Sequence, residues 1–86
     1  MVRIYELRQK EVINIKDGAR LGYICDLIID VEHGKIKFII IPGPGRIFGF
    51  FGRETEYKIA WCDIVQIGED IILVDVETKK VLIECD

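Results

Sequence analysis

Residues 21–41 read LGYICDLIIDVEHGKIKFIII, and this stretch carries the pattern that decides the fold. From Leu21 to Glu32 the odd positions are Leu, Tyr, Cys, Leu, Ile and Val, while acidic residues stand only at even positions. A period of two with one apolar face predicts a half-buried strand. Gly34 offers the positive φ that a short hairpin loop with a bulge requires. Lys35–Ile41 follows as the partner strand, with apolar even positions on one face, so the stretch predicts a β-hairpin.

Shorter segments on both sides repeat the strand pattern. The predicted strands are EVINI at 11–15, TEYKIAW at 55–61, IILVDV at 71–76 and, at a sheet edge, VLI at 81–83. Turns are predicted at Asp17-Gly18 and at Glu69-Asp70, and WCDI at 61–64 fits a single 3₁₀ turn. Regular turns between short Val- and Ile-rich segments are typical of a sandwich or a barrel. We therefore predict an all-β fold of about six to seven short antiparallel strands, in a single domain that spans residues 1–86.

Half of the 86 residues are hydrophobic, which is a large share for so small a domain. Small domains have a high ratio of surface to volume and need polar side chains to cover that surface. The excess of apolar residues favours the interpretation that another chain covers part of the surface. We therefore expect a protein partner, with a homodimer as the simplest case.

Charge and hydropathy narrow the class of partner. From Met1 to Lys58 there are 10 basic and 8 acidic residues, and from Ile59 to Asp86 there are 2 basic and 7 acidic residues. No basic stripe emerges, so nucleic acid is an unlikely main partner, because phosphate binding needs clustered Lys and Arg. No apolar run approaches the length of a membrane span, and the first residues lack the apolar centre of a signal peptide. We expect a cytoplasmic protein with no membrane contact.

The sequence shows no pattern typical of a metal site or of a catalytic site. Cys25, Cys62 and Cys85 lack the close spacing of a zinc site, and Cys25 and Cys62 lie in apolar strand-like contexts that predict buried, structural thiols. His33 precedes a glycine in a turn and is interpreted as a solvated turn residue. The chain contains no serine, so no nucleophile with an oriented base can be assembled. We predict no catalytic residues, no metal and no cofactor.

The Gly-rich loop PGPGRIFGFFG at 42–52 allows three interpretations. A phosphate cradle is disfavoured because the glycine spacing fits neither phosphate-binding pattern and no helix follows. The phenylalanines either cap one end of the core or form a contact surface for a partner. We favour the contact surface over core capping. Its candidate residues are Arg46, Ile47, Phe48, Phe50, Phe51 and Arg53.

The segments KEVIN, DG, LGYICDLIID, GKI and IVQIGEDIILVD resemble the PRC-barrel domain family over about Arg3 to Val76. The most specific part runs from Leu21 to Asp30 and continues into Gly34-Lys35. The loop, with IAWCDI and IGEDIILVD, is further similar to the YlmC/YmxH sporulation-protein subfamily. The resemblance implies a small PRC-barrel-type β-barrel without catalytic or cofactor positions, which serves as an adaptor or assembly module in a spore-forming bacterium.

The functional hypothesis is therefore a non-catalytic protein-interaction module, associated with sporulation, that acts through the aromatic loop. Two alternatives stay open. One is a ribosome- or RNA-associated assembly factor, for which RNA binding would depend strongly on salt. The other is a barrel that binds a small ligand near the loop.

Overall fold

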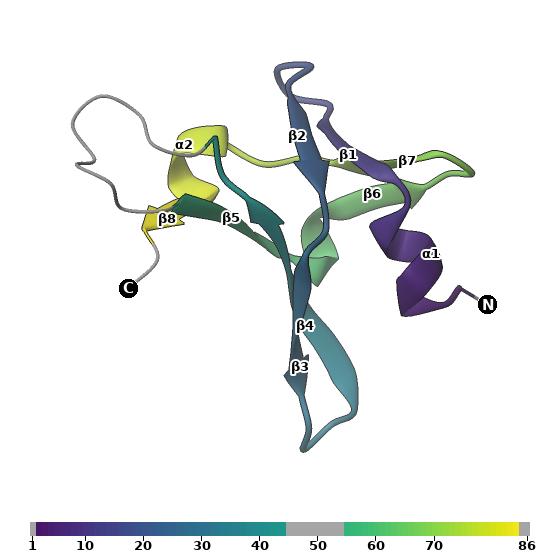
Figure 1. Cartoon of the computed structure of the whole chain (residues 1–86). Coiled ribbons are helices and arrows are strands. Elements are labelled where there is room, and N and C mark those ends of the chain that lie inside the picture. Colours follow the sequence, from purple (N-terminus) through teal and green to yellow (C-terminus); the bar gives the residue numbers. More distant parts are fainter. Residues whose placement is uncertain (1, 45–54, 85–86) are drawn as a thin grey trace.

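The computed structural model describes residues 2–44 and 55–84 (Figure 1). The elements in chain order are α1 (Ile4–Arg8), β1 (Glu11–Asn14), β2 (Arg20–Tyr23), β3 (Asp26–Asp30), β4 (Lys35–Pro42), β5 (Thr55–Ala60), the 3₁₀ turn η1 (Trp61–Asp63), β6 (Ile64–Ile67), β7 (Ile71–Val74), α2 (Thr78–Val81) and β8 (Leu82–Glu84). The helices have only 5 and 4 residues, so the all-β prediction is confirmed. The predicted 3₁₀ turn is confirmed as well.

The strands form two four-stranded sheets, in the orders β2-β1-β7-β6 and β3-β4-β5-β8. Two parts of the prediction are wrong here. Neither sheet closes into a barrel within the described residues, and β1 pairs with β7 in parallel, with Glu11 opposite Ile71 and Asn14 opposite Val74. A parallel pair needs a long connection, and here most of the chain separates the two strands. The alternation of side chains within a strand carries no information about the direction of its neighbour, so sequence periodicity alone could not predict this pair.

The core lies where the two sheets meet. Val12 from β1 and Ile72 from β7 are fully buried in one sheet, and Ile39, Ile41 and Ile59 are fully buried in the other. Each such side chain contributes about 1.5–3 kcal/mol when it leaves water. The core thus joins β4 and β5 to the sheet that contains β1 and β7.

The predicted strand from Leu21 to Glu32 is split in two. β2 belongs to one sheet and β3 to the other, and the chain crosses between them at Ile24-Cys25. Gly22 makes the bend possible, because its φ is +116° and a Cβ there would lie 3.3 Å from Cγ2 of Ile41. The crossing changes the phase of burial, so Ile24 is 3% exposed while Cys25 is exposed.

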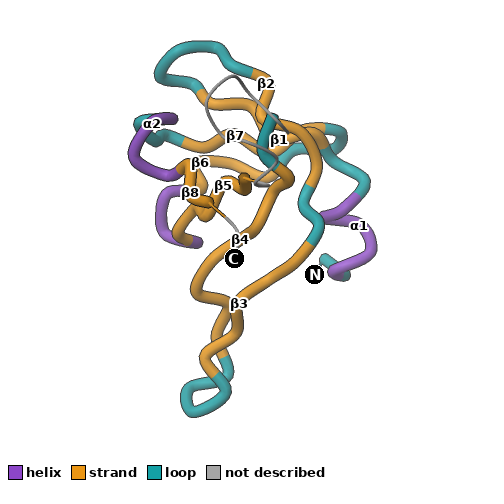
Figure 2. The backbone as a smooth tube through the Cα atoms, turned by 60° about the vertical axis from the view of Figure 1, so that its left-hand side comes forward, coloured by secondary structure: helices purple, strands orange, loops and turns teal. Residues whose placement is uncertain are grey.

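The hairpin of β3 and β4 is confirmed, and Gly34 has the predicted positive φ of +64°. Its register shifts between Ile28 and Ile29, and the outer half extends away from the body as an arm (Figures 1 and 2). The alternation predicted for β4, with apolar even positions on one face, does not extend to the end of the strand. Ile39, Ile40 and Ile41 are all buried, because this end of β4 lies inside the molecule and has neighbours on both faces.

A buried amide holds the start of α2 against the end of β1. Asn14 is fully buried, and its Nδ2 donates to the carbonyl oxygen of Val76 at 2.8 Å, while its Oδ1 accepts from the amide of Val76 at 3.2 Å. The Thr78 hydroxyl donates to Oδ2 of Asp17 at 2.9 Å, next to this amide. Buried polar groups are stable only with such partners. The network fixes the path of the chain from β7 into α2.

Candidate functional site

The aromatic loop that the sequence suggested lies outside the described residues. This applies to Arg46, Ile47, Phe48, Phe50, Phe51 and Arg53, so their role as a contact surface stays a prediction. The base of the loop is described. Pro42 lies opposite Glu56 in the β4–β5 pair, and the amide of Gly43 donates to the carbonyl oxygen of Thr55 at 2.9 Å. The two ends of the loop are therefore held together by strand pairing.

The described surface has an apolar concentration elsewhere, on α1 and around β3. Seven large hydrophobic residues in the segments 2–5 and 23–31 are exposed: Val2, Ile4, Tyr5, Tyr23, Ile28, Ile29 and Val31. Isolated exposed apolar residues are normal on any protein, whereas contiguous apolar patches are typical of surfaces that bind a partner or a ligand. Val31 is 90% exposed near the tip of the arm, where little of the described part of the chain covers it.

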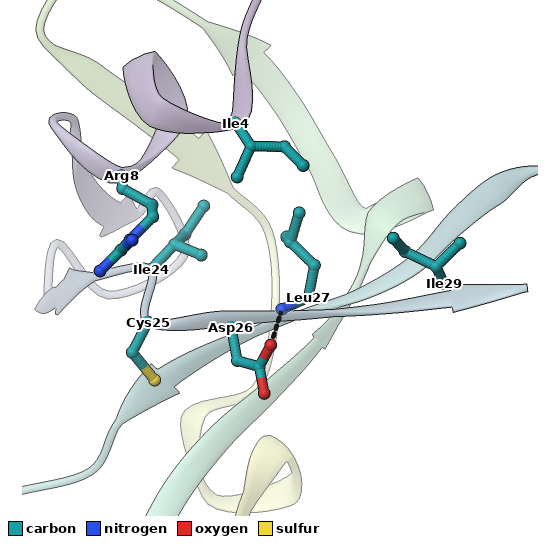
Figure 3. A pocket seen from close by; sticks show the side chains of 7 residues that line it. All are labelled: Ile4, Arg8, Ile24, Cys25, Asp26, Leu27 and Ile29. Atoms are coloured by element: carbon teal, nitrogen blue, oxygen red, sulfur yellow. Dashed lines mark hydrogen bonds between the residues drawn. The ribbon is translucent and has the colours of Figure 1, made fainter.

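A groove runs between α1 and β3, and we call it the α1–β3 groove. Its volume is about 240 Å³, and it is lined by Ile4, Arg8, Ile24, Cys25, Asp26, Leu27 and Ile29. Figure 3 shows Ile4 reaching from α1 towards the strand, while Ile24, Leu27 and Ile29 rise on the same side of β3. Ile4 and Ile29 are 51% and 50% exposed, whereas Ile24 is buried. The groove therefore has an apolar floor and two half-exposed isoleucine walls.

Charged groups stand at the rim of the groove. Asp26 projects from the opposite side of the strand from Leu27, and Arg8 extends from α1 beside Ile24 (Figure 3). Oδ1 of Asp26 accepts a hydrogen bond from the amide of Leu27 at 2.8 Å. Within the described part of the chain, neither Arg8 nor Asp26 forms an ion pair. Both charges are thus available to a partner.

The sequence did not indicate the α1 side of this groove. No element was predicted for the first ten residues, yet residues 4–8 form a helix with Leu7 buried. The available signal was the spacing of Ile4 and Leu7, three residues apart, which places them on one side of a helical turn. A single turn is too short for that signal to stand out.

The prediction of buried cysteines is wrong for the two that the structure describes. Cys25 and Cys62 are both exposed, and Cys85 lies outside the described residues. Cys25 lies at the crossing between the two sheets, where the alternation on which the prediction depended breaks down. Partial desolvation raises the pKa of the Cys25 thiol, and the negative charges of Asp26 and Glu56 raise this pKa further.

The tip of the arm carries Asp30, Glu32 and His33 close together. His33 is a solvent-exposed turn residue, as predicted, and its Nδ1 lies 2.8 Å from Oδ2 of Asp30. Oδ1 of Asp30 accepts from the amides of Glu32 and His33 at 3.0 and 3.3 Å. These contacts lower the pKa of Asp30, with the His33 side chain as the largest cause. Both carboxylate oxygens are engaged in shaping the turn, which accounts for the cluster.

Neither helix in the described part of the chain has the length and apolar run that crossing a membrane needs.

Comparison with known proteins adds three relatives and one family. The sequence profile of the PRC-barrel domain matches residues 1–81. The "Probable sporulation protein YlmC" of Bacillus subtilis is 50% identical over 74 residues, which cover 86% of this chain and 91% of that protein. An uncharacterized protein of Clostridium acetobutylicum is 43% identical, covering 84% of this chain and 82% of its own length. The "Uncharacterized protein YmxH" of Bacillus subtilis is 35% identical, with 87% and 89% covered.

Proposed function

This chain belongs to the PRC-barrel domain family, and from that premise we propose that it is a non-catalytic protein-docking module connected with sporulation. The connection with sporulation is supported by the 50% identity to a probable sporulation protein over most of both chains. The docking role is supported by the surface of this chain. Its location in the cytoplasm and its action as an adaptor belong to the same proposal.

The observation that carries the docking role is the α1–β3 groove with its exposed apolar walls. Burial of apolar surface stabilises a complex by about 25 cal/mol per Å². A partner that covers the half-exposed isoleucines beside the groove would therefore be bound more tightly. Binding energy concentrates in such packed pockets, while charged residues at the rim set orientation. The groove supplies both features.

The two alternative functions gain no support from the groove. Its volume of about 240 Å³ lies below the roughly 300–1,000 Å³ of pockets that enclose drug-sized ligands. The groove carries one basic and one acidic side chain, Arg8 and Asp26, and not the cluster of basic residues that RNA binding needs. The aromatic loop at 46–53 remains a second proposed contact surface for a protein partner, and it rests on its sequence.

The test is complementation in a spore-forming host that lacks the corresponding gene. Ile29→Asp places a charge in the wall of the groove and should fail to restore the yield of heat-resistant spores. Val65→Asp is the matched control, because Val65 is 56% exposed on β6, away from the groove, and this variant should restore the yield. Immunoblotting must show equal amounts of both variants. Full complementation by Ile29→Asp would contradict the docking role of the groove, and normal sporulation of the deletion strain would contradict the connection with sporulation.

A further inference from the structure

We propose that the partner seated on the α1–β3 groove is a second copy of this chain, related by a twofold axis that places α1 of each copy against β3 of the other. The inference rests on the proposed docking role and identifies its occupant. A twofold contact is self-complementary, so residue i meets residue j of the second copy while j meets i. The surface must therefore contain both halves of the contact.

The groove contains charges of both signs, as a self-complementary contact requires. The α1 side carries Arg3 and Arg8 with one acidic residue, Glu6, and the β3 side carries Asp26. Packing α1 of one copy over β3 of the other brings opposite charges together twice, once at each end of the axis. In particular, Arg8 faces Asp26 of the second copy, and both lack an ion-pair partner within the described residues.

The acidic residues of β3 disfavour the simplest other arrangement of two copies. β3 is an edge strand, so its free backbone could pair with β3 of a second copy. A full antiparallel pairing centred on Ile28 would set Asp26 opposite Asp30 of the other strand, at both ends. Like charges directly opposite each other destabilise such a pair. The acidic residues therefore protect the edge, and the contact uses the side-chain face of the groove.

The apolar side chains provide the centre of the contact. Ile4 stands on the α1 side at 51% exposure and Ile29 on the β3 side at 50%. In the twofold arrangement, Ile4 of each copy packs against Ile29 of the other. The half-buried Leu27 lies between them on the floor of the groove. The charged pairs then surround an apolar centre, which is the usual arrangement in protein interfaces.

The test uses two charge-reversed variants of the full chain, Arg8→Glu and Asp26→Arg, in sedimentation velocity. Wild type should dimerise with a Kd of about 1–100 µM, the range of a small interface. Each variant alone places like charges together at both contacts, so its Kd should rise at least about tenfold. An equal mixture of the two variants restores opposite charges at both contacts and should dimerise again near the wild-type Kd.

Ile29→Asp and its control Val65→Asp complete the experiment. The first should be monomeric and the second should match wild type, with unchanged circular dichroism in all variants. The inference is overturned if wild type stays monomeric at about 500 µM, if the mixture fails to dimerise, or if Ile29→Asp keeps the dimer. If wild type is monomeric but Ile29→Asp still fails to complement, the proposal of a second copy is wrong. The proposed docking role of the groove is then still supported.

Discussion

Gly34 carries the clearest conformational requirement in the turn between β3 and β4. Its φ is +64°, and a Cβ at this position would meet nothing within 4 Å. A substitution here therefore tests backbone strain without a steric clash. Residues other than glycine adopt this region at a cost, which is greatest for β-branched side chains and small for asparagine.

Gly34→Val should lower the free energy of unfolding by about 1–3 kcal/mol, because valine cannot easily adopt this φ. Gly34→Asn is the matched control and should lose less than about 1 kcal/mol. Urea denaturation of both variants measures the difference. Equal stability of Gly34→Val and wild type would mean that the turn has a different backbone.

Asp17 links stability to pH. Its carboxylate accepts hydrogen bonds from the amide of Ala19 and the hydroxyl of Thr78, both at 2.9 Å, and these bonds lower its pKa below 3.8. A lowered pKa in the folded state means that the ionised form contributes stability at pH values above the unfolded pKa. This contribution is lost as the pH falls through the folded pKa.

Asp17→Asn should therefore weaken the loss of stability between about pH 5 and pH 2. Glu69→Gln is the control, because the Glu69 carboxylate forms no hydrogen bond within the described residues, and its pH profile should match wild type. Thermal melting at several pH values gives both profiles. Parallel profiles for Asp17→Asn and wild type would show that this carboxylate is not hydrogen-bonded as described.

The exposed cysteines give a direct check on the crossing between β2 and β3. Cys25 and Cys62 should both react completely with a thiol reagent in the native protein. Cys25 should react more slowly than a free thiol at neutral pH, because its raised pKa leaves less thiolate, and its rate should keep rising with pH. Single-cysteine variants separate the two rates. If labelling requires denaturant, the two thiols are buried in the native protein, contrary to the structure.

Among the elements, those defined by local patterns were predictable from the sequence. The alternation and Gly34 predicted the hairpin of β3 and β4, and WCDI predicted η1. The parallel pairing of β1 with β7 and the split at Ile24-Cys25 were not predictable, because they depend on contacts between distant segments. The α1–β3 groove needs both the split and a one-turn helix, so periodicity alone could not predict it.

The role proposed for Phe50 and Phe51 in the Gly-rich loop between β4 and β5 can be tested separately. Replacing Phe50 and Phe51 with Ser should leave the free energy of unfolding within about 1 kcal/mol of wild type if the rings are covered only by a partner. The same double variant should then fail in the sporulation assay. The core-capping alternative predicts a loss of about 3–5 kcal/mol for each fully buried phenylalanine. Urea denaturation of dilute protein distinguishes the two.

The shape of the whole molecule explains why apolar surface remains uncovered. Its principal dimensions are 41 × 31 × 20 Å, and the arm of β3 and β4 extends from the body (Figures 1 and 2). An arm of two strands has too little depth to bury its own side chains, so Ile28, Ile29 and Val31 stay exposed. α1 lies beside the base of the arm and forms the other wall of the groove. Seven of the eleven exposed large hydrophobic residues of the described chain thus lie in the segments 2–5 and 23–31.

Methyl NMR through a dilution series tests the docking face most directly, because it locates association on the surface residue by residue. The methyl signals of Ile4, Ile24 and Ile29 should shift together as the protein is diluted from about 500 µM to 10 µM, following one Kd. The methyl signals of Val65 and Ile15, which are exposed away from the groove, should stay unchanged. Shifts confined to Val65 or Ile15, or no concentration-dependent shift at Ile4 and Ile29, would contradict the association of two copies through this groove.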